Sequence, residues 1–397
     1  MLIVFNFPIS SVRRSAIIFP PVVQVGRELT TADARRYSRQ LVIPEIGSLG
    51  QQRISNAKVL CVGAGGLGSP VLLYLAAAGV GTLGVIDFDF VDESNLQRQV
   101  IHGQSDIGRS KVESAKAKIH EINPAVTVDM HRLRLDVSNV LEIFSCYDII
   151  VDGTDNFATR YLINDACVVL NKPCVMGSVF RFDGQASVFW SAHGPCYRCV
   201  YPTPPPEGLV PNCAESGVLG ALCGLIGALQ ATETLKLITG IGSPLVGSMV
   251  IYNGLESTYD KIKITKDPDC SLCADTSKAQ LLEDYEAFCG LPTFSSEITA
   301  EQLAARIHAG EVIQLIDVRE EFEWDEFHIQ GAVLIPQAEF YDGRAQTKIL
   351  RDRPIVLYCH LGIRSAHALS ALKQSGYEDV SHLLGGIDSW NEYKRNG

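Results

Sequence analysis

Two pairs of cysteines form the clearest metal-binding pattern in this chain. Cys196 and Cys199 make one Cys-x-x-Cys pair, and Cys270 and Cys273 make a second pair much later in the sequence. Thiolates at this spacing hold zinc tetrahedrally, and four sulfur ligands are typical of a structural site because they leave no open coordination position. A redox dithiol, which needs only one pair, is the alternative. We expect the two pairs to share one Zn²⁺ ion.

Another cysteine lies in a short loop that is suited to a sulfur anion. Within Tyr358–Ser365, four residues separate Cys359 from Arg364, between a predicted strand (355–358) and a predicted helix (365–375). In such a loop, successive backbone amides point at the sulfur and the arginine adds positive charge, which stabilises a thiolate or a persulfide. Cysteine-dependent phosphatases place one residue more between cysteine and arginine. The shorter loop here favours a single sulfur atom over a phosphate.

Cys213 also has a suggestive position. It lies in the segment 211–217, directly before a predicted buried helix (217–239), and a helix N-terminus favours the thiolate form. A buried structural cysteine fits this position about as well. Position alone leaves both interpretations open.

A glycine-rich run, Gly63–Gly68, lies between a predicted strand and a predicted helix. Gly63, Gly65 and Gly68 have the spacing of a phosphate-binding fingerprint, in which the backbone approaches phosphate at a helix N-terminus. Asp87 ends the next predicted strand, where a carboxylate can accept hydrogen bonds from ribose hydroxyls. By itself, this fingerprint favours a nicotinamide or flavin site.

Charged residues near the glycine run favour a triphosphate with magnesium over a dinucleotide. Arg98 follows Asp87 closely, Lys111 begins the next predicted helix, and Asp155 lies just past a predicted strand. The carboxyl edge of such a sheet is where ligands bind. With Arg39, these groups supply the cations and carboxylates that a triphosphate and its metal need, although each alone is often a solvated surface group.

Composition limits the classes of partner. The net charge of −11 argues against nucleic-acid binding, which requires a basic surface. The longest apolar stretch, 218–231, is shorter than the ~20 residues that span a bilayer, and no export signal precedes the first domain. We therefore expect a cytoplasmic protein that does not enter a membrane and whose cysteines are reduced.

Short apolar runs that alternate with helical segments position these residues. The alternation predicts a Rossmann-like, doubly wound α/β fold whose mainly parallel sheet has an antiparallel extension near 180–190. A small α/β domain follows. The predicted parts are an N-terminal extension (1–30), a nucleotide-binding domain (31–275), a linker (276–296) and the small domain (297–397).

Over residues 31–275, the chain resembles the MoeB/ThiF-type E1-like adenylyltransferases, on the motifs RYSRQ, GAGGLG, DFD, NLQRQ and GTDN. The resemblance implies that ATP and Mg²⁺ are bound, with zinc at the two cysteine pairs. The residues implied in ATP binding are Arg39, Gly63, Gly65, Gly66, Gly68, Asp87, Ser94, Asn95, Leu96, Gln97, Arg98, Lys111, Asp155 and Asn156. Asp155 would hold Mg²⁺, and Arg98 would reach into the site of a second subunit, which implies a homodimer. Cys213 would lie in the catalytic loop and form a thioester or a disulfide with the protein substrate.

From about residue 296 to its end, the chain resembles a rhodanese, on Ile316–Arg319, His328–Ala332 and the Cys359 loop. The resemblance implies that Cys359, assisted by Arg364, carries a persulfide. A non-catalytic docking module is the alternative.

Together, the two resemblances imply one pathway. The first domain would adenylate the C-terminal glycine of a ubiquitin-like sulfur carrier ending in Gly-Gly, and Cys359 would supply sulfur to give a thiocarboxylate. The sulfur donor would be a cysteine desulfurase or thiosulfate, and the carrier could serve molybdopterin, thiamine, cysteine or tRNA thiolation. The rival interpretations are a nicotinamide dehydrogenase with a sulfurtransferase tail and a non-enzymatic scaffold.

Overall fold

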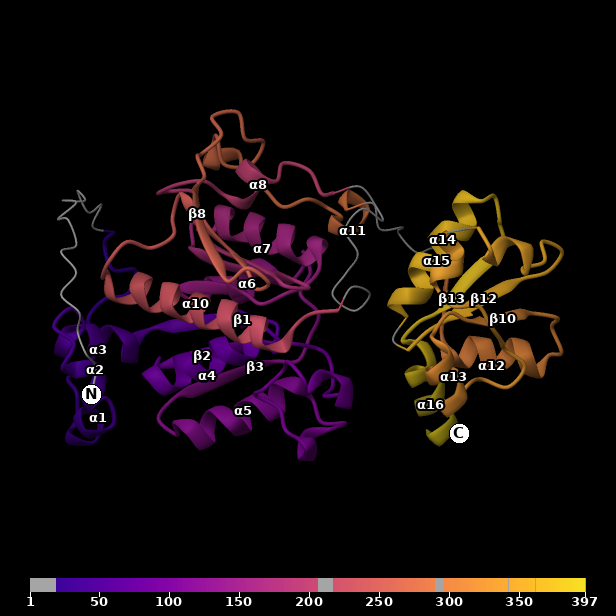
Figure 1. Cartoon of the computed structure of the whole chain (residues 1–397), viewed down its shortest axis with the longest axis horizontal. Helices are drawn as coiled ribbons and strands as arrows, with labels where there is room; N and C mark the ends of the chain where they lie inside the picture. Colours follow the sequence, from indigo (N-terminus) through magenta and orange to yellow (C-terminus); the bar gives the residue numbers. More distant parts are fainter. Residues whose placement is uncertain (1–18, 206–216, 290–295, 342, 361, 397) are drawn as a thin grey trace. The chain divides into compact units, whose positions relative to one another are not determined.

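The computed structural model describes residues 19–205, 217–289, 296–341, 343–360 and 362–396. The chain divides into two compact units, Met1–Cys289 and Gly290–Gly397, which we describe separately (Figure 1).

The first unit is built on one sheet of eight strands in the order β3-β2-β1-β4-β5-β6-β7-β8. Strands β1 to β5 run parallel, and β6, β7 and β8 continue the sheet antiparallel. This confirms the predicted fold class and its antiparallel extension. The strands are β1 (Lys58–Val62), β2 (Thr82–Ile86), β3 (Thr127–His131), β4 (Ile149–Asp152), β5 (Cys174–Phe180), β6 (Asp183–Phe189), β7 (Ser248–Asn253) and β8 (Thr258–Lys263).

Burial along the strands follows from their place in the sheet. β4 is buried at every residue and β1 at all but its first, because central parallel strands are covered on both faces. β8, at the antiparallel edge, is exposed along its whole length. The short apolar runs in the sequence therefore correspond to the central strands.

Two groups of helices cover the sheet. α4 packs against α5 and α10, whereas α7 packs against α6, α8 and α11, and both groups contact the strands (Figure 1). The helices described are α1 (Thr31–Arg36), α2 (Ser38–Leu41), α3 (Gly47–Asn56), α4 (Gly68–Ala78), α5 (Lys111–Ile122), α6 (Val140–Ser145), α7 (Phe157–Val169), α8 (Tyr197–Val200), α10 (Gly220–Thr239) and α11 (Tyr285–Phe288).

Helix α10 is long and apolar enough to cross a membrane by length and composition. More than half of it is buried inside the unit, where it contacts α3, α4, β5 and β6. Such burial is typical of a core helix.

Residues 276–289 contain a 3₁₀ turn and α11, which packs on α7. The Tyr285 hydroxyl donates a hydrogen bond of 2.8 Å to Asp165 Oδ2. The domain boundaries that we placed on both sides of 276–296 stay a prediction, and the first part of that segment packs on the first unit.

The second unit has a parallel sheet of five strands in the order β11-β10-β12-β13-β9. The strands are β9 (Glu297–Ile298), β10 (Gln314–Asp317), β11 (Val333–Leu334), β12 (Ile355–Tyr358) and β13 (Val380–Leu383). The helices are α12 (Ala300–His308), α13 (Glu321–Glu326), α14 (Ala338–Tyr341), α15 (Ile363–Gln374) and α16 (Gly386–Asn396). The buried strand β12 ends directly before Cys359.

Candidate functional site

The glycine loop joins β1 to the N-terminus of α4. Gly63 has a φ of +95°, and a Cβ atom on Gly68 would lie 1.9 Å from the Gly63 carbonyl oxygen. Only glycine allows this close approach. The loop amide of Ala64 donates to Asp87 Oδ2 at 2.9 Å, so the structure joins the glycine loop to the acid at the end of β2.

Asp87 and Lys111 are linked through an acid that the sequence analysis did not single out. Asp87 Oδ1 accepts the Asp89 amide at 2.9 Å, and Lys111 Nζ lies 2.8 Å from Asp89 Oδ2. The Lys111 side chain is 7% exposed, whereas that of Asp89 is 37% exposed. Burial raises the pKa of Asp87 above its ordinary value, and Lys111 partly offsets this. A buried cation therefore lies near the glycine loop.

The segment after Asp87 brings Arg98 to the same loop. Asp92 caps a 3₁₀ turn and accepts the Ser94 amide at 2.8 Å, and Arg98 Nη1 donates to the Ser94 carbonyl at 3.1 Å. A Cβ atom on Gly66 would lie 3.5 Å from Arg98 Cγ and 3.0 Å from Cys223 Sγ. Arg98 is therefore close to the backbone of the glycine loop, and Gly66 leaves little space between that loop and Cys223.

The remaining members of the predicted ATP site lie at or near the surface. Asp155 follows β4 and is exposed, as is Arg39 on α2. In the described part of the chain, neither is hydrogen-bonded to the glycine loop. Asn156 caps α7, because its Oδ1 accepts the Thr159 amide at 2.9 Å. Ser94 and Gln97 are exposed, whereas Asn95 and Leu96 are partly buried.

A buried ion pair fixes the turn that carries Asp155, and the sequence analysis missed it. Asp152 Oδ1 accepts the amide and the hydroxyl of Thr154 at 2.9 and 2.6 Å. Asp152 Oδ2 lies 3.3 Å from Arg160 Nε, and Arg160 Nη2 donates to the Thr154 carbonyl at 2.9 Å. Gln230, on α10, donates to the Asp152 carbonyl at 2.7 Å. The only signal in the sequence was a charge at the end of an apolar strand.

His102 is a second residue that the sequence analysis missed. Its Nε2 lies 3.0 Å from the Ala64 carbonyl and its Nδ1 lies 2.8 Å from Ser114 Oγ. Burial lowers the pKa of His102, so the ring is neutral at pH 7 and holds the glycine loop by hydrogen bonds.

The two cysteine pairs come together in the first unit. The sulfur atoms of Cys196, Cys199, Cys270 and Cys273 all lie within 4.8 Å of one another. Three of the S···S distances are 3.4, 3.7 and 3.8 Å. Four ligands about 2.3 Å from zinc in a tetrahedron lie about 3.8 Å apart, so the cluster fits this ion. The alternative, a redox use of one pair, would leave the other pair without a role.

Cys213, the predicted second reactive cysteine, lies outside the described residues. Its role stays a prediction.

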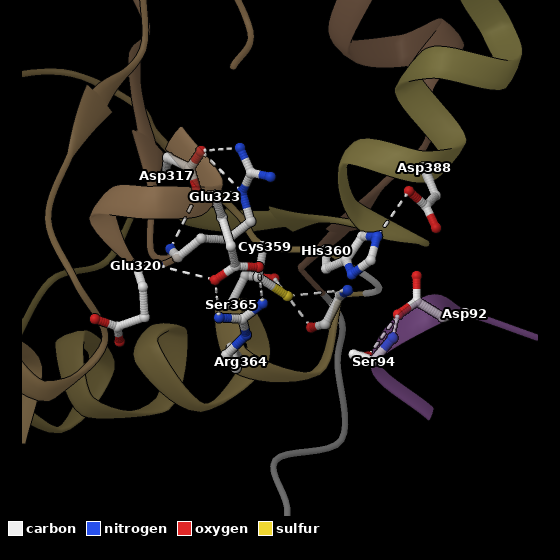
Figure 2. Close-up of polar contacts among 12 residues, drawn as sticks. Asp92, Ser94, Asp317, Glu320, Glu323, Cys359, His360, Arg364, Ser365 and Asp388 are labelled. Atoms are coloured by element: carbon white, nitrogen blue, oxygen red, sulfur yellow. Dashed lines mark hydrogen bonds and ion pairs between the residues drawn. The ribbon is translucent and has the colours of Figure 1, made fainter. Parts of the chain in front are cut away.

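Cys359 lies at the end of β12, with its sulfur buried beneath its own loop (Figure 2). Gly362 has a φ of +97°, which turns its amide towards the sulfur, and the N–H donates to Cys359 Sγ at 3.1 Å. The Ser365 hydroxyl lies 3.6 Å from the same sulfur. The loop therefore places donors where an anionic sulfur needs them.

Arg364 is held by an acid that the sequence analysis missed. Its Nη1 and Nη2 donate to the two carboxylate oxygens of Glu323 on α13, each at 2.6 Å (Figure 2). Burial raises the pKa of Glu323, but the hydrogen bonds from Arg364 and the Glu320 amide, together with the charges of Arg364 and Arg319, outweigh this effect and keep the pKa below its ordinary value. The charge of Arg364 is thus paired beside the loop. The acidic run 320–326 offered no reason to choose Glu323.

Two further polar contacts connect segments of the second unit. His360 Nε2 lies 3.2 Å from Asp388 on α16 (Figure 2), and Arg319 pairs with the buried Asp317 at 2.7 Å. Arg319 also donates to the Phe327 carbonyl at 2.6 Å, which joins the motif after β10 to the segment that follows α13.

Both units are similar to known protein families. The "ThiF family" model matches residues 37–272, and the "Rhodanese-like domain" model matches residues 299–393. A probable adenylyltransferase/sulfurtransferase MoeZ of Mycobacterium tuberculosis is 52% identical over 382 residues, which cover 94% of this chain and 96% of that protein. A sulfur carrier protein adenylyltransferase of Thermus thermophilus is 48% identical over 267 residues, which cover 66% of this chain and 98% of that protein.

Among solved structures, MccB of E. coli has the same fold, with a TM-score of 0.56, at 23% identity. The match covers 64% of this chain and 75% of MccB. The ThiF match spans more than half of the chain and includes the glycine loop, and the MoeZ match covers nearly the whole chain. The chain therefore belongs to the ThiF family and carries a rhodanese-like domain in its second unit.

Proposed function

We propose that this chain adenylates the C-terminal glycine of a ubiquitin-like sulfur carrier and then delivers sulfur to it as a thiocarboxylate. The observation that carries the proposal is the presence, in one chain, of a glycine loop beside Lys111 and a buried Cys359 under donors for anionic sulfur. The MoeZ relative, named for both activities, aligns with 94% of the chain. The Thermus relative, named for a sulfur carrier, aligns with 66% of the chain.

In the first step, the carrier carboxylate attacks the α-phosphate of ATP, and pyrophosphate leaves. The amides of the glycine loop, Lys111 and Arg98 neutralise charge on the phosphates. Asp155 is the carboxylate that would hold Mg²⁺, which supplies positive charge to the triphosphate. Adenylation is required because a carboxylate resists nucleophiles, whereas an acyl adenylate has AMP as a leaving group.

In the second step, the Cys359 thiolate takes a sulfur atom from a donor and becomes a persulfide, which Gly362 and Ser365 stabilise. The terminal sulfur attacks the acyl adenylate, and AMP leaves. A thiol reductant then cleaves the acyl disulfide, is itself oxidised to a disulfide, and releases the thiocarboxylate and the Cys359 thiol. Cys213 is proposed to help resolve this intermediate through a thioester or a disulfide with the carrier.

We also propose that the four-cysteine cluster holds structural Zn²⁺, because its geometry fits and no ligand position is left open. Arg98 is proposed to act in the site of a second subunit in a homodimer. A cysteine desulfurase or thiosulfate is proposed as the donor in the cytoplasm, and molybdopterin, thiamine, cysteine or tRNA thiolation as the pathway.

The proposal is tested by incubating the full chain with MgATP, thiosulfate and a carrier ending in Gly-Gly, followed by intact-mass measurement of the carrier. We expect the mass change of an oxygen-to-sulfur exchange. Omission of ATP and the Cys359→Ala variant should each abolish it. An unmodified carrier in the complete reaction, with several carriers tried, would contradict the proposal.

A further inference from the structure

The basic side chains of the cysteine loop are neutralised by carboxylates from outside it. In the part of the loop that the structure describes, these side chains are His360 and Arg364. Arg364 Nη1 and Nη2 each lie 2.6 Å from an oxygen of Glu323 (Figure 2), and His360 Nε2 lies 3.2 Å from Asp388. The pKa of Glu323 lies below its ordinary value, so this acid is ionised at pH 7 and cancels the charge of Arg364.

The surface beside the loop adds no positive charge of its own. Arg319, which follows β10, is 2.7 Å from the buried Asp317 and is therefore also paired. Helix α13, which supplies Glu323, belongs to an acidic run. The exposed acids of that run are Glu320, Glu321, Asp325 and Glu326. An anion that reaches the cysteine loop therefore meets paired cations and unpaired negative charge.

This arrangement disfavours a doubly charged sulfur donor such as thiosulfate. A dianion gives up part of its hydration when it enters the loop, and no net positive charge compensates that loss. Arg364 cannot easily exchange Glu323 for the donor, because their side chains are only 24% and 15% exposed and the displaced carboxylate would have little access to water. Coulomb energy is proportional to the charge of the donor, so a monoanion is penalised about half as much.

We propose that Glu323 determines the charge of the sulfur donor: by neutralising Arg364, it makes Cys359 accept donors with one negative charge or none in preference to dianions. Thiosulfate is then a weak donor, and thiosulfonates and neutral persulfides are better ones. The inference deepens the proposed function and rests on it in so far as Cys359 must be the residue that accepts sulfur.

Two small donors of similar size separate charge from shape. Methanethiosulfonate has a methyl group where thiosulfate has a charged oxygen. The Cys359 thiolate attacks the outer sulfur of either donor and forms an S–S bond. The S–S bond of the donor breaks, and its electron pair leaves with sulfite or with methanesulfinate. Cyanide then removes the outer sulfur of the persulfide as thiocyanate and restores the thiolate.

The test measures kcat/KM for thiocyanate formation by the full chain with each donor at low salt. Glu323→Gln frees the charge of Arg364 and should raise kcat/KM about tenfold for thiosulfate and about threefold for methanethiosulfonate, because the new attraction scales with donor charge. The gain should lie in KM. Glu326→Gln, the same change at an exposed position of α13, should alter either value less than about twofold. A purely structural role of Glu323 would lower both values instead.

The salt dependence of the unchanged chain gives a second measurement that needs no variant. An increase in ionic strength from about 0.02 to about 0.5 M screens any attraction between a free cation and the donor. Since the loop offers no net attraction, kcat/KM for thiosulfate in the unchanged chain should stay constant or rise. In Glu323→Gln it should fall at least threefold or so over the same range.

An equal or lower kcat/KM for thiosulfate in folded Glu323→Gln would overturn the inference, and so would an equal gain for the two donors. Melting curves establish that the variants are folded. If Glu323→Gln does not fold, a steep fall with salt in the unchanged chain would still overturn it. Transfer from neither donor would contradict the proposed role of Cys359 itself, whereas transfer with the wrong charge dependence contradicts this inference alone.

Discussion

The Asp152–Arg160 pair gives a prediction that links stability to adenylation. We consider Asp152→Asn, which keeps the size of the side chain and removes its charge. Only 1% of the Asp152 side chain and 9% of the Arg160 side chain are exposed. Loss of one partner of such a buried pair costs about 3–5 kcal/mol, because the other charge stays buried.

Two features of the structure lower this expected loss of unfolding free energy. The Asp152–Arg160 distance of 3.3 Å is long for a charge-assisted bond, and Arg160 retains the Thr154 and Gly177 carbonyls as acceptors. The amide oxygen of the new asparagine can still accept from Thr154. We therefore expect a loss of about 2–3 kcal/mol, or roughly 4–12 °C in melting temperature at about 2–4 °C per kcal/mol for a domain of this size.

The matched control is Asp183→Asn, the same chemical change at an exposed position of the same sheet. Asp183 accepts a hydrogen bond of 2.8 Å from Asn253 at the surface, and its loss should cost less than about 0.5 kcal/mol. Scanning calorimetry measures the stability of both variants. Pyrophosphate exchange into ATP, with carrier present, should fall at least tenfold in Asp152→Asn alone, because the turn that carries Asp155 loosens. Equal melting and full exchange in Asp152→Asn would refute the reasoning.

Four further outcomes follow from the sites. Asp155→Ala should abolish pyrophosphate exchange without lowering the melting temperature, since its side chain is exposed, and normal exchange would exclude it as the metal carboxylate. Cys196→Ser or a chelator should release about one zinc per chain, measured by elemental analysis, and lower the melting temperature. Cys359→Ala should lose sulfur transfer from thiosulfate to cyanide but keep pyrophosphate exchange. Glu323 has a lowered pKa, so its bond to Arg364 stabilises the second unit above pH 4.5, and this stabilisation is lost as the pH falls through the lowered value. Glu323→Gln should therefore show a smaller fall of the melting temperature between neutral and acid pH than the unchanged chain does.

Local patterns predicted the parts of these sites that depend on backbone geometry. Gly63 and Gly68 could be chosen because a tight turn between strand and helix excludes a Cβ atom, and the turn has that geometry. The two cysteine pairs could be joined because four reduced thiols at this spacing complete the tetrahedral shell of a single zinc ion. The small α/β unit and its buried strand before Cys359 followed from short apolar runs.

The residues that the sequence did not reveal act through contacts distant along the chain. Asp89 contacts Lys111, and Glu323 contacts Arg364 from another helix. Acidic residues at such positions are usually solvated surface groups, so nothing local distinguished Glu323 from its acidic neighbours. His382 is on a strand that follows the cysteine loop, and its partner Ser365 is identified only by the folded geometry.

The two sites differ in how their cations are held, and this difference bears on their chemistry. Lys111 is nearly buried, but its partner Asp89 is more than one-third exposed. A phosphate can therefore replace Asp89 as the partner of Lys111, because the displaced carboxylate can be solvated by water or bind a metal ion. Arg364 is held at both ends of its guanidinium by Glu323, whose side chain is only 15% exposed. If another anion replaced Glu323 as the partner of Arg364, the Glu323 carboxylate would be left unpaired with little access to water. The first site is therefore suited to exchange one anion for another, whereas the second must stabilise its sulfur anion chiefly through neutral donors, the Gly362 amide and the Ser365 hydroxyl.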